Sequence, residues 1–306
     1  MEQLLGMNFD EVSLQFSKIS MYPLFDAAHY IVSVMALKEQ PGAVDVARRS
    51  PFACWISAMI YCFGGAVLSG LFLAEPALLP FSNTSNIVLA SIIWYLVFYF
   101  PMDLVYKFTA FLPLRLVLAS MKEVTRTWKV VGGVAHARAR YEEGWLVMIA
   151  VGWAKGAGGG LMSNFEQLVR GVWKPETNEL LKMSYPVKVT LVGSVLFTLQ
   201  QSQYLPLAKH QLMFMYTMFL VINKIRMMIT HSTTSVFAPF EAVLYSLLFQ
   251  WQTGVQGPSG APKKGIKGRK ESPNGSTDTN GNISESVEEK ANGTTVPRNG
   301  YRKKTD

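Results

Sequence analysis

The sequence predicts an all-α integral membrane protein with about seven transmembrane helices. The chain has 306 residues, of which 49% are hydrophobic and only 16% are charged. The charged residues gather in the last quarter and in short loops, and several nearly uncharged windows reach the roughly 20 residues that a helix needs to cross a bilayer. Much of the net charge of +8 lies beside these windows, which favours anionic lipid over nucleic acid as the partner.

The predicted spans are separated by short connections that contain helix-breaking residues, such as Gln40-Pro41-Gly42 and Lys174-Pro175. The seven spans are residues 16–37, 51–73, 86–106, 108–130, 144–169, 185–204 and 208–230. Three spans in each half place the second half upside down relative to the first, which is an inverted repeat with a seventh helix added.

This order divides the chain into five predicted parts. They are an N-terminus outside the cytosol (1–15), a three-helix repeat (16–106), a second three-helix repeat (107–205), a seventh helix with an interfacial extension (206–251) and a disordered cytosolic tail (252–306). The excess of Lys and Arg in alternate loops sets this orientation. The final residues, Lys303-Lys304-Thr305-Asp306, match a dilysine retrieval signal of endoplasmic reticulum membrane proteins.

The fourth span carries a stripe of four basic residues, about 60° wide at about 100° per residue. They are Arg115, Lys122, Arg126 and Lys129, with Glu123 among them. A Lys or Arg at mid-bilayer costs roughly 2.5 to 3.5 kcal/mol, so the stripe should face a polar cavity, a carboxylate or a bound phosphate. Three interpretations stay open: a voltage-responsive stripe, a lipid headgroup site and a structural ion-pair cluster. Neutralisation by phosphate favours lipid binding at Lys122 and Arg126, with Lys129 as a candidate gate.

Glycine clusters occupy corresponding positions in the second and fifth spans. They are Gly64, Gly65 and Gly70 in the second span, and Gly152, Gly156, Gly158, Gly159 and Gly160 in the fifth. Paired interruptions of this kind point to a pathway at the repeat interface, with a kink or break in each helix. The competing interpretation is that the glycines only allow neighbouring helices to pack closely.

Two aspartates, Asp26 and Asp103, lie at membrane depth. Each could attract cations, although pairing with a lysine of the fourth span is the favoured alternative. The four histidines have no metal-ligand spacing, and the sequence has no zinc motif, nucleophile elbow or phosphate loop. We therefore expect neither an enzyme nor a catalytic cofactor.

Several motifs resemble the trimeric intracellular cation channels of the sarcoplasmic and endoplasmic reticulum, in particular the muscle-rich type A. The resemblance rests first on Lys122-Glu123-Val124, followed by Arg126 and Lys129, and covers roughly residues 16–230. Further matching motifs are Phe25-Asp26, Pro41-Gly42-Ala43-Val44, Phe81-Ser82-Asn83, Trp94-Tyr95, Gly144-Trp145, Gly152-Trp153 and the stretches 161–168 and 171–178.

The resemblance implies seven helices in an inverted repeat, one pore in each subunit of a homotrimer, and potassium as the main permeant ion. It also implies counter-ion flux during calcium release across the sarcoplasmic or endoplasmic reticulum membrane, with the nuclear envelope as a further location. In the family the motif's Lys and Arg contact a phosphoinositide, which corresponds to Lys122 and Arg126 here. A further basic residue linked to voltage gating corresponds to Lys129, and luminal calcium inhibits. A secondary transporter is the alternative function, because inverted repeats with broken helices are typical of transporters.

Overall fold

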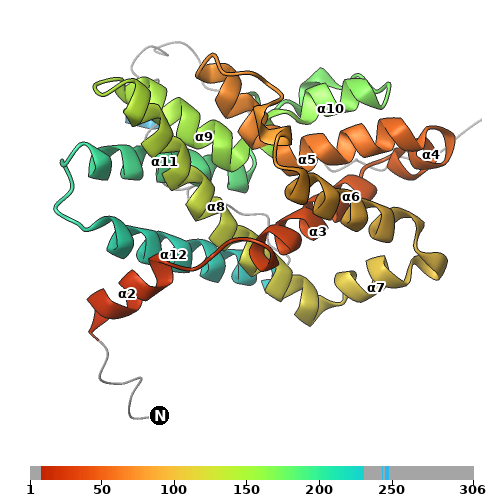
Figure 1. Ribbon diagram of the computed structural model, residues 1–306, viewed down its shortest axis with the longest axis horizontal. Helices are drawn as coiled ribbons and strands as arrows, with labels where there is room; N and C mark the ends of the chain where they lie inside the picture. The colour runs from red at the N-terminus through yellow and green to blue at the C-terminus, as the bar shows by residue number, and fades with distance from the viewer. Residues whose placement is uncertain (1–7, 231–242, 244, 248–306) are drawn as a thin grey trace, which may run out of the picture. The chain divides into compact units, whose positions relative to one another are not determined.

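The structure is a computed structural model and describes residues 8–230, 243 and 245–247. This part of the chain contains eleven α-helices, three short 3-10 helices and no β-strand, which confirms the predicted all-α class for these residues (Figure 1). The α-helices are α2 (Phe9–Ser17), α3 (Leu24–Lys38), α4 (Ala43–Arg49), α5 (Pro51–Phe72), α6 (Thr84–Tyr99), α7 (Leu104–Ala110), α8 (Leu112–Arg140), α9 (Trp145–Leu161), α10 (Ser163–Val169), α11 (Tyr185–Gln201) and α12 (Lys209–Thr230). The predicted tail and most of the predicted interfacial segment lie outside the described residues.

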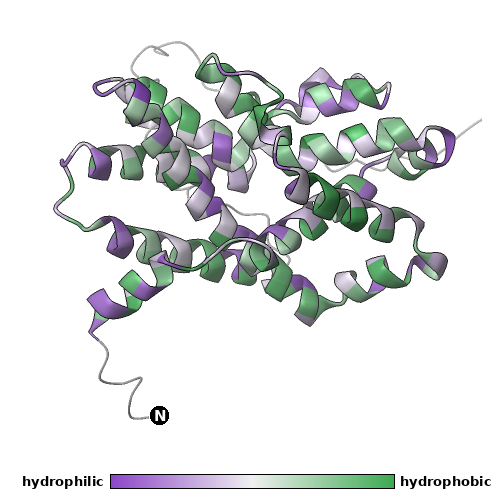
Figure 2. Cartoon of the chain, viewed as in Figure 1, coloured by the Kyte–Doolittle hydropathy of each residue, from purple (hydrophilic) through white to green (hydrophobic). Residues whose placement is uncertain are grey.

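Three helical stretches of the described residues are long and apolar enough to cross a membrane: α5, the α9–α10 stretch Trp145–Val169, and α12. A fourth candidate is α6 with Pro101–Ala110, a pair bent by 93°. The count of seven spans is not confirmed by this criterion, because α3 and α11 have only 15 and 17 residues and α8 carries the basic stripe. Figure 2 shows α5 and α6 as largely hydrophobic, whereas hydrophilic residues gather at helix ends and connections.

Two predicted spans are interrupted in the structure. The first span was expected to be one helix from residue 16 to 37, but α2 ends at Ser17 and α3 begins only after Pro23. The third was expected to continue to residue 106, but α6 ends before Pro101 and the chain turns into α7. Proline has no backbone N–H to donate and pushes the residue before it out of the helical region, so α6 ends directly before Pro101. Pro23 sets the start of α3 and does not explain why α2 ends at Ser17.

The helices form two groups of three, and each group has its own apolar core. In the first group α3, α5 and α6 pack against one another, and in the second α8, α9 and α11 do so. The cores include Tyr30, Val34, Ala58 and Val97 in the first group, and Val130, Val151, Val189 and Phe197 in the second. The groups meet where α3 contacts α8 and α5 contacts α9, and α12 packs on α8, α11 and α2.

The glycines allow α5 and α9 to touch backbone to backbone. A Cβ atom on Gly158 would clash with the backbone of Gly65, and one on Gly65 would clash with the carbonyl oxygen of Lys155. The expected break is absent from α5, which is continuous from Pro51 to Phe72, and the interruption after α9 falls at Met162, beyond the glycine cluster. The close-packing interpretation therefore explains Gly65 and Gly158.

Candidate functional site

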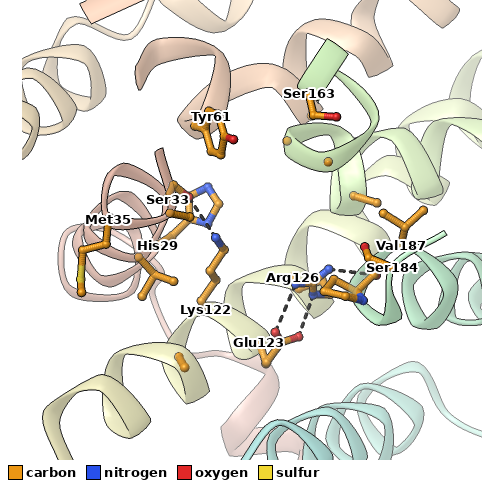
Figure 3. Close-up of a pocket in the computed structure, with 18 of the residues that line it drawn as sticks. His29, Ser33, Met35, Tyr61, Lys122, Glu123, Arg126, Ser163, Ser184 and Val187 are labelled. Atoms are coloured by element: carbon orange, nitrogen blue, oxygen red, sulfur yellow. Dashed lines mark hydrogen bonds and ion pairs between the residues drawn. The ribbon is translucent and has the colours of Figure 1, made fainter. Parts of the chain in front are cut away.

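A cavity of about 710 Å³ lies among α3, α5, α8, α9 and α12. Figure 3 shows Lys122, Glu123 and Arg126 of α8 at this cavity, with His29 and Ser33 of α3 beside Lys122. The basic stripe of the fourth predicted span thus faces a cavity with polar groups in its wall, which reduces the cost of placing its cations against lipid tails.

The cavity brings together ten of the residues that the sequence singled out. They are Arg115, Lys122, Glu123, Arg126, Lys129, Gly65, Gly156, Gly158, Gly159 and Gly160. Among the described residues, Gly64, Gly70, Gly152, Asp26 and Asp103 do not line it. The glycines contribute backbone to the wall, so α9 can approach α5 without side chains filling the space between them.

The charges that line the cavity are mainly positive. The six basic residues are Arg115, Lys122, Arg126, Lys129, Lys155 and Lys224, whereas the three acidic ones are Glu39, Glu123 and Glu179. An excess of three positive charges around one cavity attracts anions and opposes the entry of cations. The function of the cavity therefore depends on which of these basic side chains form ion pairs within the protein and which do not.

Arg126 is held by an extensive set of bonds. Its Nε and Nη2 donate to the two carboxylate oxygens of Glu123 at 2.7 and 3.1 Å, and both side chains are buried. Its Nη1 donates to the carbonyl oxygen of Pro186 at 3.1 Å and to Oγ1 of Thr190 at 3.0 Å. Arg126 therefore ties α8 to the first turns of α11, which is the geometry of a structural ion pair.

Lys122 and Lys129 have neutral partners instead. Lys122 Nζ donates to Oγ of Ser33 at 3.1 Å, and Lys129 Nζ lies 2.7 Å from Nε2 of His29. Within the part of the chain that the structure describes, no carboxylate forms an ion pair with either lysine. A charged group supplied from outside the chain, such as a phosphate, can therefore satisfy them.

The helical fold and the basic cavity can now be compared with those of known protein families. The family model described as TRIC channel matches residues 40–231, which is more than half of the chain. The chain belongs to the TRIC channel family. The relatives found are named as ion channels, in line with the expectation that the protein is not an enzyme.

Relatives of the TRIC chain include both types of the family. It is 63% identical to the trimeric intracellular cation channel type B of Xenopus tropicalis, over 80% of this chain and 86% of the relative. It is 57% identical to the human type B channel, over 80% and 84% of the two chains. The type A channel of Xenopus tropicalis is 51% identical, over 81% and 84%. The expectation of type A is therefore not supported, because these type B relatives are more similar to this chain than the type A relative is.

Solved structures agree with the TRIC fold. A structure described as "Structural basis for activity of TRIC counter-ion channels in calcium release" is 64% identical and covers 73% of this chain and 100% of its own, with a TM-score of 0.71. A trimeric intracellular cation channel from C. elegans with bound Ca2+ is 40% identical, covers 73% of this chain and 97% of its own, and has a TM-score of 0.67.

The two membrane-depth aspartates of the TRIC chain differ in their surroundings. Asp103 pairs with Lys38 of α3 at 2.8 Å, so the favoured pairing with a lysine of the fourth span is wrong for it. Lys38 also donates to the carbonyl oxygen of Val97 at 2.7 Å, which holds the bend between α6 and α7. Asp26 lies within electrostatic range of Lys129 but forms no ion pair with any residue that the structure describes.

His29, Ser33 and Thr190 are the site residues that sequence reasoning missed. Each is a polar residue buried in a helix, and His29 and Ser33 stand four residues apart on one face of α3. That spacing was a usable signal, because two polar residues on one face of an apolar helix require partners. Thr190 offered no such signal, since a lone threonine can bond to its own helix.

Proposed function

We propose that this chain is one subunit of a homotrimeric, potassium-conducting channel of the sarcoplasmic or endoplasmic reticulum membrane, and that it supplies counter-ion flux during calcium release. Membership of the TRIC family supports channel activity. The names of the relatives support the trimer, the intracellular membrane and the cation, and one related structure is described in terms of counter-ion activity. The observation that carries the proposal is the cavity lined by charged and polar residues from helices of both three-helix groups.

The proposed topology has seven spans, with the N-terminus in the lumen and the C-terminus in the cytosol. Two contacts support an inverted repeat: α3 packs on α8, and α5 packs on α9, so the first and second helices of one group meet their counterparts in the other. A shared axis between inverted halves is where pathways form in membrane proteins. In this topology the charged α8 crosses the membrane with its bases turned to the cavity.

A phosphoinositide headgroup is the proposed ligand of Lys122 and Arg126. The basic excess of the cavity and the lack of a carboxylate on Lys122 among the described residues support this assignment. Arg126 already bonds to Glu123, so Lys122 is the residue with the most to gain from a phosphate. Binding of the headgroup would also reduce the positive potential that opposes cations.

Voltage and luminal calcium are the proposed regulators, with Lys129 as the gating residue. Lys129 lies half-buried on the cavity wall, and a charge that moves across the whole membrane field changes in energy by about 2.3 kcal/mol per 100 mV. The relative from C. elegans has been solved with bound Ca2+, which supports a calcium-regulated family.

Single-channel recording of the purified protein in planar bilayers tests this function. With opposed potassium and chloride gradients, we expect a reversal potential near the potassium equilibrium value, and calcium should act from one side only. Bilayers that stay silent beside saturable solute uptake into vesicles would instead establish the alternative, a secondary transporter on an inverted repeat.

A further inference from the structure

Helices α3 and α8 meet through three polar pairs. Arg115, Lys122 and Lys129 follow one another at seven-residue spacing on α8, so they lie on one face. Arg115 contacts Glu39, the residue directly after α3, at 2.8 Å. Lys122 and Lys129 contact Ser33 and His29 of α3 at 3.1 and 2.7 Å. The partners run in the opposite order along the chain, so the two helices are antiparallel. Each of the three basic residues contacts a different partner.

The His29 contact differs from the other two because its ring nitrogen has two neighbours. Nε2 lies 2.7 Å from Nζ of Lys129 and 3.1 Å from the carbonyl oxygen of Cys62 in α5. A lysine ammonium can only donate a hydrogen bond, and a carbonyl oxygen can only accept one. Nε2 must lack a proton to bind Lys129 and must carry a proton to bind Cys62, so His29 can make only one of these bonds at a time.

The charged groups around His29 are mainly cations. Lys122, Arg126 and Lys129 face it from α8, and the carbonyl oxygen of Cys62 lies beside it on α5. Asp26 is the acidic group on its own helix, one turn away. A ring that stays neutral among three cations changes partner by moving its proton between Nδ1 and Nε2, without a change in net charge.

We propose that His29 is the positioning residue for Lys129 and selects between two places for its ammonium group. With the proton on Nδ1, Nε2 accepts from Lys129 and holds it against α3. With the proton on Nε2, the ring donates to Cys62 and Lys129 is released into the cavity, where its charge opposes passing cations. The inference rests on the proposed function, in which Lys129 gates a cation path.

Two substitutions separate this role from simple packing. His29→Ala removes the acceptor, so we expect the open probability to fall about threefold or more, as is usual for the loss of a direct contact. In His29→Gln the amide oxygen can accept from Lys129 while the amide nitrogen donates to Cys62, so the open probability should equal or exceed that of the unaltered protein. Neither substitution should have an effect in a Lys129→Gln background. His210→Gln, a histidine outside the cavity, is the matched control.

A chemical readout tests the same idea without relying on current. In the purified full-length protein, an amine-reactive ester is applied briefly, and labelling of Lys129 is compared with that of Lys122 by mass spectrometry. We expect the ratio to rise about threefold or more in His29→Ala and to stay unchanged in His29→Gln. An unchanged ratio in His29→Ala, or a fall in open probability that persists with Lys129→Gln, would overturn the proposal. Absence of potassium current from the unaltered protein would overturn only the proposed function.

Discussion

The buried ion pairs and the cavity lysines use positive charge in opposite ways. Arg126 pairs with Glu123 one turn away on α8, and Arg170 pairs with Glu166 one turn away on α10, with all four side chains buried. Both arginines also reach a carbonyl oxygen of another segment, that of Pro186 for Arg126 and that of Pro41 for Arg170 at 3.0 Å.

The cavity lysines have no such arrangement. Lys122 and Lys129 are half-buried, and over the described ranges their bonds are to a serine and a histidine. A buried pair that satisfies its own charge fixes helices in place, whereas a half-buried cation without a carboxylate leaves charge for a ligand or a moving gate. The difference gives the arginines a structural role, which Arg126 has in addition to its proposed lipid contact, and leaves the charge of the lysines for a ligand or a gate.

Arg126→Ala is expected to have the largest effect on stability. It leaves the Glu123 carboxylate buried without its partner, which costs about 3 to 5 kcal/mol of unfolding free energy. Lys122→Ala is the matched control on the same helix and should lose far less, because it leaves only the Ser33 hydroxyl behind. Thermal unfolding of purified protein measures both. Equal losses would remove the distinction between the two kinds of base.

The contact between Gly65 of α5 and Gly158 of α9 allows a test of the cavity wall without any change in charge. Gly158→Ala places a methyl group on the backbone of Gly65, so overpacking should cost about 1 to 3 kcal/mol. Gly132→Ala is the control, because no atom lies within 4 Å of its added methyl group and alanine favours a helix. The melting temperature should fall for the first and hold or rise for the second. A stable Gly158→Ala protein would show that the contact between α5 and α9 can relax.

Retention of bound lipid tests whether the charge of Lys122 is used by a ligand. Lys122→Ala should weaken binding of phosphatidylinositol bisphosphate about tenfold, since a hydrogen bond to a charged group contributes about 1.5 to 3 kcal/mol. Native mass spectrometry of protein purified with that lipid measures the loss. Lys107→Ala, an exposed base outside the cavity, is the control. Unchanged retention would remove the lipid role from Lys122.

An exposed pair should have the smallest effect. Asp10 of α2 accepts from His210 at 2.7 Å and from Gln211 at 2.8 Å on α12, and the hydrogen bond from His210 lowers the pKa of the Asp10 carboxyl. A lowered pKa means that the contribution to stability is present above the ordinary pKa of a carboxyl and is lost as the pH falls through the lowered value. The melting temperature of Asp10→Asn should thus decline slightly less on acidification than that of the unaltered protein. Parallel pH profiles would contradict this.

The sequence predicted the helical class and most helix positions, because long apolar windows and prolines are local signals. Four predicted spans, 51–73, 144–169, 185–204 and 208–230, agree within a few residues with α5, α9–α10, α11 and α12. The first span failed because hydropathy continues through residues 18–23, where the backbone turns. Hydropathy averages over windows and does not register a single proline.

The candidate site was predicted in part for a similar reason. Helical periodicity placed the bases of α8 on one face and put Glu123 beside Arg126, since both follow from spacing within one helix. The partners of Lys122 and Lys129 come from α3, about 90 to 100 residues earlier in the chain, and depend on how two helices pack. The same limit explains why Asp103 was expected to pair with a lysine of the fourth span, although its partner in the structure is Lys38 of α3.

The unitary conductance of Lys155→Gln tests most directly whether the basic cavity is the cation path. Lys155 lines the cavity from α9 and is assigned neither to the lipid nor to the gate. Removal of its charge should raise the potassium conductance about twofold at low salt, where local potential controls ion concentration, and Lys107→Gln should leave it unchanged. Equal conductance in the unaltered and Lys155→Gln proteins would place the cation path elsewhere in the molecule.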